Sequence, residues 1–338
     1  MTSLDGRATI LETERGPIQV ARDGAGPKVM TIHGSPGGFD QGLVWARHLR
    51  DGGCELIAPS RPGYLRTPLD SGRNPAQQAD LYAAMLDALH IKKVTVLGIS
   101  SGGPSAVHFA ARHPNRTNAL LLDAAVLLPI APAVNALERA IFESSIGTWL
   151  SCEIAKKRPK LTAALTVDAL AAGLSKDRKR DAVEWITSNP ARLHDVADLP
   201  TSLAPRRFRE SGQRNDESNE TNLTPLPFAE ITAPTLIAQG TNDAFPLLDH
   251  ATHAAEEMDG AELMLVDGGH HGLPWCRHVG AVTQRQLELS LAEPGSTNWT
   301  GLANWAQTRN NPPKGVEPGV LPVSGSFPER TFTEVSTR

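Results

Sequence analysis

The sequence predicts an α/β fold built on a mostly parallel sheet with helices on both faces. Short apolar runs of strand length alternate along the chain with helical patterns, which is the order of successive βα units. Several of these runs end directly in glycine-rich turns that carry Ser, Asp or His. The chain has 338 residues, of which 40% are apolar, so it can bury a substantial core.

The N-terminal third supplies most of the expected sheet. Residues 8–24 alternate apolar and polar side chains, which predicts an antiparallel hairpin at the sheet edge. Asn74 fits the N-cap of a following helix, and Pro75 fits its first turn. Buried strands are expected at 28–34, 54–60, 92–98 and 118–125, and helices at 40–53, 74–90 and 104–113.

The alternation stops near Val126 and resumes near residue 234. Helical patterns at 136–157 and 176–188 fill the interval, and the polar stretch 209–222 predicts a mobile loop. Strands at 234–240 and 261–267 then alternate with helices at 246–258 and 278–293. The expected division is a first core part at 1–125, a helical cap at 126–227, a second core part at 228–293 and a Pro-rich tail at 294–338.

The tail has little periodicity, and we expect it to be mobile. The alternative is that Trp299 and Trp305 dock onto the body or onto a second copy of the chain.

Composition and charge narrow the classes of function. A net charge of −4 without clustered Lys and Arg argues against nucleic acid as a partner. No apolar stretch approaches the ~20 residues of a membrane span, and the charged N-terminus does not resemble a signal peptide. Three widely spaced cysteines indicate reduced thiols. We therefore expect a cytoplasmic protein with a small-molecule substrate; a homo-oligomer is compatible with the sequence.

The stretch "VLGISSGG" contains two serines between a strand and a helix. A strand followed by G-x-S-x-G and a helix is the nucleophile-elbow pattern, whose sharp turn requires small residues two before and two after the nucleophile. With Ser100 as nucleophile those positions are Gly98 and Gly102, whereas Ser101 would place Ile99 there. Ser100 is therefore the candidate nucleophile, and the N–H of Ser101 a candidate oxyanion donor.

An activated serine needs a base and an acid that orients it. Asp243 follows the strand that ends at Gly240, at the sheet edge where the nucleophile also lies, and is the candidate acid. Asp249 and Asp267 lie nearby. Asp123, at the end of the 118–125 strand, is the rival because some enzymes of this architecture take the acid from that strand.

The candidate base comes from "GGHHG" after the next strand. Gly268 and Gly269 suit a loop that turns the first histidine back toward the elbow, which favours His270. His271 remains a real alternative.

A second oxyanion donor is expected in "HGSPGG", which follows the 28–34 strand. Pro36 has no N–H, so the amide of Ser35 is the natural donor. His33 is expected to brace this loop.

Together, "HGSPGG", "SRPGY", "GISSGGP", "GTNDAFP" and "GGHHG" make residues 8–293 resemble the α/β-hydrolase family. The resemblance implies an eight-stranded sheet, with a helical cap between the sixth and seventh strands that roofs an apolar pocket. It also implies Ser100 as nucleophile, Asp243 as acid, His270 as base and the Ser35 and Ser101 amides as oxyanion hole. It implies neither an organic cofactor nor a metal.

The leading hypothesis is a serine hydrolase that acts on a small carboxylic ester or related acyl compound. The same triad serves a proline iminopeptidase-like aminopeptidase, a carbon–carbon bond hydrolase and a perhydrolase. For an aminopeptidase, acids of the cap would hold the substrate amine: Glu143, Glu153 or Glu184. Two hypotheses of other classes are a non-catalytic ligand-binding protein on this fold and metal binding through His270, His271, Cys276 and His278.

Overall fold

The computed structural model describes residues 7–130, 153–155, 157–292 and 320–323. Its centre is one sheet with the strand order β1-β2-β4-β3-β5-β6-β7-β8-β9. The strands from β4 to β8 run parallel, and β1, β2 and β9 pair antiparallel to their neighbours. The strands are β1 (Ala8–Leu11), β2 (Ile18–Gly24), β3 (Lys28–Ile32), β4 (Glu55–Pro59), β5 (Val94–Ile99), β6 (Thr117–Asp123), β7 (Thr235–Gly240), β8 (Glu262–Val266) and β9 (Val320–Val323).

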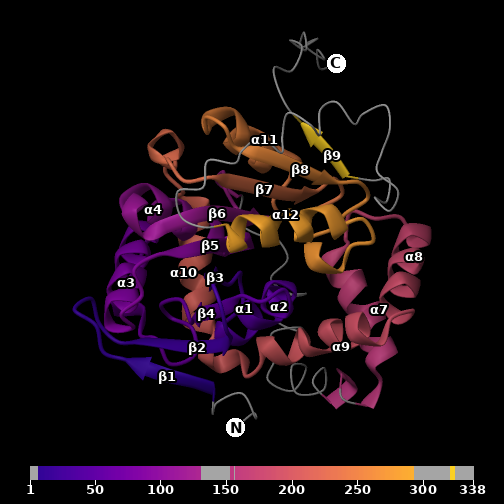
Figure 1. The fold of residues 1–338 in the computed structure, drawn as a ribbon. Helices are drawn as coiled ribbons and strands as arrows, with labels where there is room; N and C mark the ends of the chain where they lie inside the picture. Colours follow the sequence, from indigo (N-terminus) through magenta and orange to yellow (C-terminus); the bar gives the residue numbers. More distant parts are fainter. Residues whose placement is uncertain (1–6, 131–152, 156, 293–319, 324–338) are drawn as a thin grey trace, which may run out of the picture.

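Helices cover both faces of this sheet (Figure 1). The helices of the core are α1 (Phe39–Trp45), α2 (Arg47–Asp51), α3 (Pro75–Ala88), α4 (Gly103–Arg112), α11 (Leu248–Glu257) and α12 (Gly280–Leu291). Side chains from α1, α2 and α12 share one buried cluster with one face of the strands, and those from α3, α4 and α11 share the cluster on the other face. The predicted fold class is confirmed.

Local sequence explains how the best-defined elements form. All six residues of β5 are buried, and its side chains alternate between the two clusters, with Leu97 in one and Val96 in the other. Helix α3 starts with the full capping box in which Asn74 and Gln77 exchange side-chain and backbone bonds. The helix predicted at 40–53 is instead two short ones, because the backbone leaves helical geometry at Ala46.

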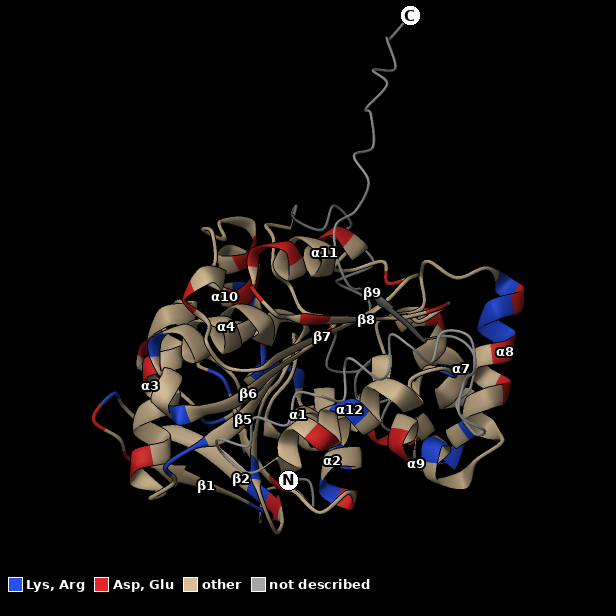
Figure 2. Cartoon of the chain, turned by 45° about the horizontal axis from the view of Figure 1, so that its top comes forward, with Lys and Arg blue, Asp and Glu red and all other residues tan. Residues whose placement is uncertain are grey.

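The chain between β6 and β7 inserts further helices. They are α7 (Pro159–Leu170), α8 (Lys176–Thr187), α9 (Pro190–Asp198) and α10 (Glu210–Thr221). Helices α7, α8 and α9 lie together at one side of the sheet, away from α3 and α4 (Figures 1 and 2). The helix predicted at 176–188 agrees with α8. Most of the pattern at 136–157 lies outside the described residues.

The polar stretch 209–222 forms helix α10, so its prediction as a mobile loop is wrong. Two of its residues are buried, Gly212 and Asp216, four positions apart on one helical face. Gly212 donates its N–H to the Gly63 carbonyl at 2.9 Å, and a Cβ built on Gly212 would lie 2.2 Å from the Tyr64 ring. A helix poor in apolar residues therefore docks on the core through a small residue and a buried charge.

A ninth strand comes from the segment predicted as a mobile tail. Strand β9 pairs with β8 from Val266↔Val320 to Leu263↔Val323 and covers that edge of the sheet. Trp299 and Trp305 lie outside the described residues.

Figure 2 shows a predominantly tan sheet, with charged segments on the surrounding helices and loops and a few on the strands. Helix α8 carries blue and red segments along its length. Among the described residues, no helix is long and apolar enough to cross a membrane.

Candidate active site

The serine doublet lies in a sharp turn between β5 and α4. Ser100 has φ = 49°, a left-handed conformation that is uncommon for a residue with a side chain and typical of strained functional turns. A Cβ built on Gly98 would lie 2.6 Å from Ala106 Cβ, and one built on Gly102 would lie 2.4 Å from the Ile32 carbonyl oxygen. The turn therefore requires glycine on both sides of Ser100, in the positions that the elbow pattern prescribes.

The loop after β3 packs directly against this turn. A Cβ built on Gly34 would lie 3.0 Å from Ser100 Cβ, so the "HGSPGG" loop and the elbow share one surface. Ser101 is the second residue of a 3₁₀ turn that precedes α4, where backbone amides lack intrahelical partners. No described residue accepts a hydrogen bond from the Ser35 N–H. Both predicted oxyanion amides therefore belong to segments next to the Ser100 side chain.

His33 braces this loop, as the sequence suggested. Its Nε2 accepts the Arg61 N–H at 2.9 Å, so in the neutral ring Nδ1 carries the proton and donates it to the Gly34 carbonyl at 2.7 Å. Burial, followed by the charge of Arg61, lowers the pKa of His33 well below its usual value. The ring is thus a neutral structural bridge rather than a proton carrier.

The acid and base candidates meet at the carboxyl ends of β7 and β8. Asp243 Oδ2 lies 2.9 Å from His271 Nδ1, and the carboxylate also accepts the Phe245 N–H and the Gln239 side-chain amide. The Asp243 side chain is fully buried, whereas that of His271 is 13% exposed. Because Nδ1 donates to the carboxylate, Nε2 of a neutral His271 is free to accept a proton.

His270 does not take the position that the sequence favoured for it. Its Nδ1 accepts the Gly272 N–H at 3.1 Å, so this nitrogen cannot donate to a carboxylate. The ring is 2% exposed, and burial, with a smaller contribution from His271, lowers its pKa to about 4. The histidine that hydrogen-bonds to Asp243 is therefore His271 and not His270.

The candidate metal site is not assembled. Cys276 Sγ instead accepts the His270 N–H at 3.3 Å, and burial raises the pKa of this thiol to about 12. Across the described ranges, no group of three or more His, Cys, Asp or Glu side chains could hold a metal ion.

The rival acid, Asp123, belongs to a separate polar network. Its carboxylate accepts Trp45 Nε1 at 3.0 Å and Gln286 Nε2 at 2.5 Å, and Gln286 Oε1 lies 2.8 Å from His48 Nε2. Burial raises the pKa of Asp123 to about 6. Neither histidine of the doublet hydrogen-bonds to it, so Asp123 is a structural group in this conformation.

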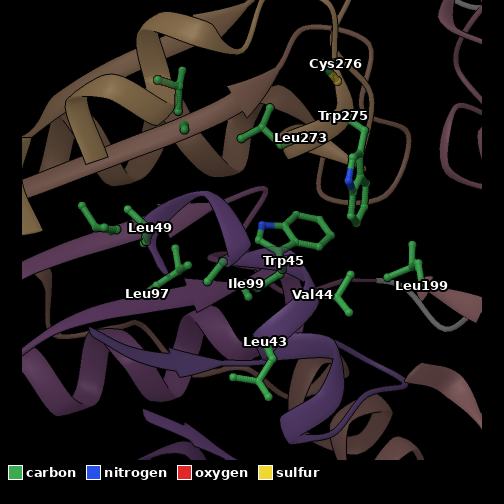
Figure 3. Close-up of a cluster of buried hydrophobic side chains, with 14 of the residues drawn as sticks. Leu43, Val44, Trp45, Leu49, Leu97, Ile99, Leu199, Leu273, Trp275 and Cys276 are labelled. Atoms are coloured by element: carbon green, nitrogen blue, oxygen red, sulfur yellow. The ribbon is translucent and has the colours of Figure 1, made fainter. Parts of the chain in front are cut away.

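Aromatic rings lie around the Asp243–His271 pair. The Phe245 ring centroid lies 5.0 Å from that of His271, and the Trp45 centroid lies 6.3 Å from it. Trp45 also meets Trp275 edge to face at 5.4 Å, and Figure 3 shows these two rings facing each other within the buried cluster. Phe245 is 49% exposed, so an apolar surface continues outward from His271.

Among the described residues, no hydrogen bond joins the Ser100 hydroxyl to either histidine; such contacts often form only in the substrate complex.

Sequence reasoning missed a buried ion pair beneath the elbow. Arg61 from "SRPGY" forms a two-pronged bond with Asp216 of α10, with N–O distances of 2.8 and 2.5 Å, and the two side chains are 2% and 3% exposed. The Tyr64 hydroxyl also donates to Asp216 and lies 2.9 Å from Ser35 Oγ. The one indication in the sequence is that Gly212 and Asp216 are four positions apart in a stretch that is otherwise entirely polar. This spacing places both residues on one face of a helix.

Another carboxyl group lies beside the elbow on the same helix. Glu220 and Ser101 line the same small hollow, and burial, followed by the charge of Asp216, raises the pKa of Glu220 to about 7. The acids proposed to hold a substrate amine are placed differently. Glu184 is exposed, Glu153 pairs with Lys157 at 3.7 Å, and Glu143 lies outside the described residues.

The fold and this edge of the sheet define the class of protein. A family model described as alpha/beta hydrolase fold matches residues 27–275, and the chain belongs to that family. The chain is 27% identical over 285 residues to an uncharacterized hydrolase, YcgS, of Bacillus subtilis (strain 168). The aligned region is 82% of this chain and 95% of that protein.

A second relative has a stated reaction. The 2-hydroxy-6-oxononadienedioate/2-hydroxy-6-oxononatrienedioate hydrolase of Escherichia coli (strain K12) is 27% identical over 284 residues, which are 79% of this chain and 87% of that protein. Among solved structures, an alpha/beta hydrolase fold protein from Nakamurella multipartita is 35% identical, with a TM-score of 0.79 over 84% of this chain and 99% of that one. The relatives are hydrolases, and hydrolysis is the class of activity that they support here.

Proposed function

We propose that the chain is a serine hydrolase that cleaves a small carboxylic ester or related acyl compound. Ser100 is the nucleophile, His271 the base and Asp243 the acid that orients it. The observation that carries the proposal is the 2.9 Å bond between His271 Nδ1 and the buried Asp243 carboxylate, at the sheet edge that also holds Ser100 in its left-handed turn.

The first half of the reaction forms an acyl-enzyme. His271 Nε2 takes the hydroxyl proton as Ser100 Oγ attacks the substrate carbonyl carbon, and Asp243 stabilises the resulting imidazolium. The carbonyl oxygen becomes negative and accepts the N–H groups of Ser35 and Ser101. The helix that starts at Gly103 adds the positive end of its dipole at the same place. His271 then gives its proton to the leaving alcohol.

The second half releases the acid. Water enters where the alcohol left, His271 takes a proton from it, and the hydroxide attacks the acyl carbon with the same two amides holding the oxyanion. Ser100 regains its proton from His271 as the carboxylic acid departs. No metal or organic cofactor is needed for these steps.

The second candidate is carbon–carbon bond hydrolysis. It is favoured by the Escherichia coli relative, whose name specifies a 2-hydroxy-6-oxo dienedioate substrate. The same nucleophile and base would act on a ketone carbonyl, and the leaving group would be a carbon rather than an alcohol oxygen. A side-by-side assay of p-nitrophenyl esters, aminoacyl arylamides and a synthetic 2-hydroxy-6-oxo-dienoate separates these chemistries.

The functional assignment is tested with Ala variants of the three residues. Loss of the nucleophile or base of such a triad costs about 10⁶ in kcat, and loss of the acid about 10⁴. We expect those losses for Ser100→Ala, His271→Ala and Asp243→Ala on the best substrate of the panel. Ser105→Ala, whose hydroxyl donates to the Gly102 carbonyl, is the matched control. Near wild-type turnover by Ser100→Ala would refute the proposal, and saturable ligand binding without turnover by the wild type would favour a non-catalytic binding protein.

A further inference from the structure

The Gly34 carbonyl receives two hydrogen bonds from side chains outside the reacting groups. His33 Nδ1 donates at 2.7 Å, and one terminal nitrogen of Arg61 donates at 3.3 Å. The Gly34 N–H is also bound, by Gln41 Oε1 at 2.8 Å. A loop residue with all its backbone groups engaged is held in one orientation.

This carbonyl belongs to the same peptide group as the Ser35 N–H, because a peptide unit joins the C=O of one residue to the N–H of the next. The group is planar, so fixing the oxygen fixes the direction of the N–H on the other side. Hydrogen bonds to the oxygen also polarise the unit, which makes its N–H a stronger donor. The Ser35 amide is the one proposed above to hold the oxyanion.

Arg61 in turn depends on the inserted helix α10. Asp216 accepts a hydrogen bond from each terminal nitrogen of the guanidinium in a buried, two-pronged contact. In this orientation each of the two nitrogens also donates to a backbone carbonyl oxygen. One of those oxygens is the Gly34 carbonyl, and the other is the Ser101 carbonyl at 3.3 Å. A single guanidinium therefore reaches both segments that carry the oxyanion amides.

A second route from the same carboxylate ends on the same loop. The Tyr64 hydroxyl donates to Asp216, so the Ser35 hydroxyl, 2.9 Å away, donates to the Tyr64 oxygen. Asp216 thus holds Ser35 from two sides: its peptide group through Arg61 and its side chain through Tyr64.

We propose that Arg61 and Asp216 are positioning residues of the oxyanion hole, through which helix α10 of the insertion sets the direction of the Ser35 N–H. This inference rests on the proposed function, since it needs an oxyanion at Ser100. Both side chains are almost fully buried, so they act through the backbone of the loop that carries the Ser35 N–H. The hole is therefore complete only when α10 is docked on the core.

The test compares Asp216→Asn and Arg61→Lys with the wild type in the full-length chain. Asparagine is isosteric with Asp216 but neutral, and lysine keeps the charge of Arg61 without the fork that reaches two carbonyls. Asp198→Asn is the matched control, because it removes another ion pair between core and insertion, Arg47–Asp198 at 2.7 Å, without contact to Gly34. Near-UV circular dichroism shows whether each variant is folded. If Asp216→Asn does not fold, the comparison uses Arg61→Lys alone.

The readouts are kcat and KM on the best ester, and inhibition by the matching trifluoromethyl ketone and by the carboxylate product. The ketone adds to Ser100 and places an oxyanion in the hole, whereas the product does not. We expect kcat to fall at least about tenfold, short of the 10²–10³ lost with a whole donor. KM should change less than about threefold. In both variants, affinity for the ketone should fall by the same factor as kcat/KM, and affinity for the product should be unchanged. Asp198→Asn should match the wild type in all of these measurements.

Four results decide against a role in positioning or against the function itself. Wild-type kcat in both variants would overturn this inference and leave the proposed function standing, as would a rise in KM at constant kcat. Equal losses of affinity for ketone and product would reduce the pair to general support of the fold. If the wild type neither hydrolyses any substrate of the panel nor reacts with a fluorophosphonate, the proposed function is wrong and this inference falls with it.

Discussion

The stability of Asp123→Asn relative to the wild type should be higher at neutral pH than in acid. Its turnover should be unchanged. The carboxyl group is 1% exposed and accepts hydrogen bonds from Trp45 and Gln286. Both donors are neutral, so they do not compensate for the removal of the charge from water. Burial therefore raises the pKa of Asp123 from its usual 3.8 to about 6.

The size of the effect follows from that difference. At about 1.4 kcal/mol per pKa unit, a rise from 3.8 to about 6 corresponds to about 3 kcal/mol. A carboxyl group whose pKa is higher in the folded state binds more protons there than in the unfolded state. Its unfavourable contribution is absent below pH 4, grows between pH 4 and 6, and is complete above pH 6.

The assay is urea unfolding of the wild type and Asp123→Asn at pH 4 and pH 7.5. The asparagine oxygen can keep the Trp45 bond, and its amide can face the Gln286 carbonyl if that side chain flips, with His48 changing tautomer. We expect the difference in unfolding free energy between variant and wild type to move by up to about 3 kcal/mol in favour of the variant from pH 4 to pH 7.5.

The same variant separates a structural carboxylate from a catalytic one. Asp123→Asn should keep kcat within about twofold of the wild type, whereas Asp243→Asn should lose about 10⁴, as expected when the tautomer of the base is lost. If the difference in unfolding free energy between variant and wild type is the same at both pH values, the pKa of Asp123 is not raised in the folded protein. A loss of about 10⁴ in kcat for Asp123→Asn would make it the acid and refute the role of Asp243.

Further predictions concern the elbow, a helix start and the docking of the insertion. Gly102→Ala should cost about 1–3 kcal/mol because its Cβ would lie 2.4 Å from a β3 carbonyl oxygen, and an unchanged Tm would contradict this close approach. Asn74→Ala removes a capping box and should cost about 1 kcal/mol with kcat unchanged, which thermal unfolding and the ester assay measure. Asp40→Asn leaves the buried Arg209 guanidinium without its ion partner and should cost about 3–5 kcal/mol in urea unfolding. Asp40→Leu combined with Arg209→Met should recover most of that loss; an unrecovered loss would indicate that the pair is needed for packing.

The fold could be predicted because its signals are local and repeated. Fully buried strands such as Val94–Ile99 are continuous apolar runs, and the glycines around Ser100 are required by contacts within one turn. The position of Asp243 follows from the end of its strand, since the carboxyl ends of parallel strands meet at one edge of the sheet. For these residues, spacing along the chain determines position in space.

Local sequence is not sufficient where contacts between distant residues decide the outcome. His270 and His271 are adjacent in one loop, and they differ in their partners: His271 Nδ1 bonds to the Asp243 carboxylate, whereas His270 Nδ1 accepts the Gly272 N–H. Helix α10 has almost no apolar periodicity, because a buried ion pair to Arg61 rather than an apolar stripe docks it. Neither a side-chain direction within a loop nor a partner about 150 positions away is encoded in local pattern.

The proposed function depends above all on Ser100 being a nucleophile activated by His271. The most direct measurement is reaction of the wild type, His270→Asn and His271→Asn with a fluorophosphonate, followed by peptide mass spectrometry of the adduct. Asparagine at 270 keeps an acceptor for the Gly272 N–H, so both variants are comparably conservative. We expect a stoichiometric adduct on Ser100 in the wild type and in His270→Asn, and its loss in His271→Asn. An adduct on Ser101, or labelling that depends on His270 and not on His271, would contradict it.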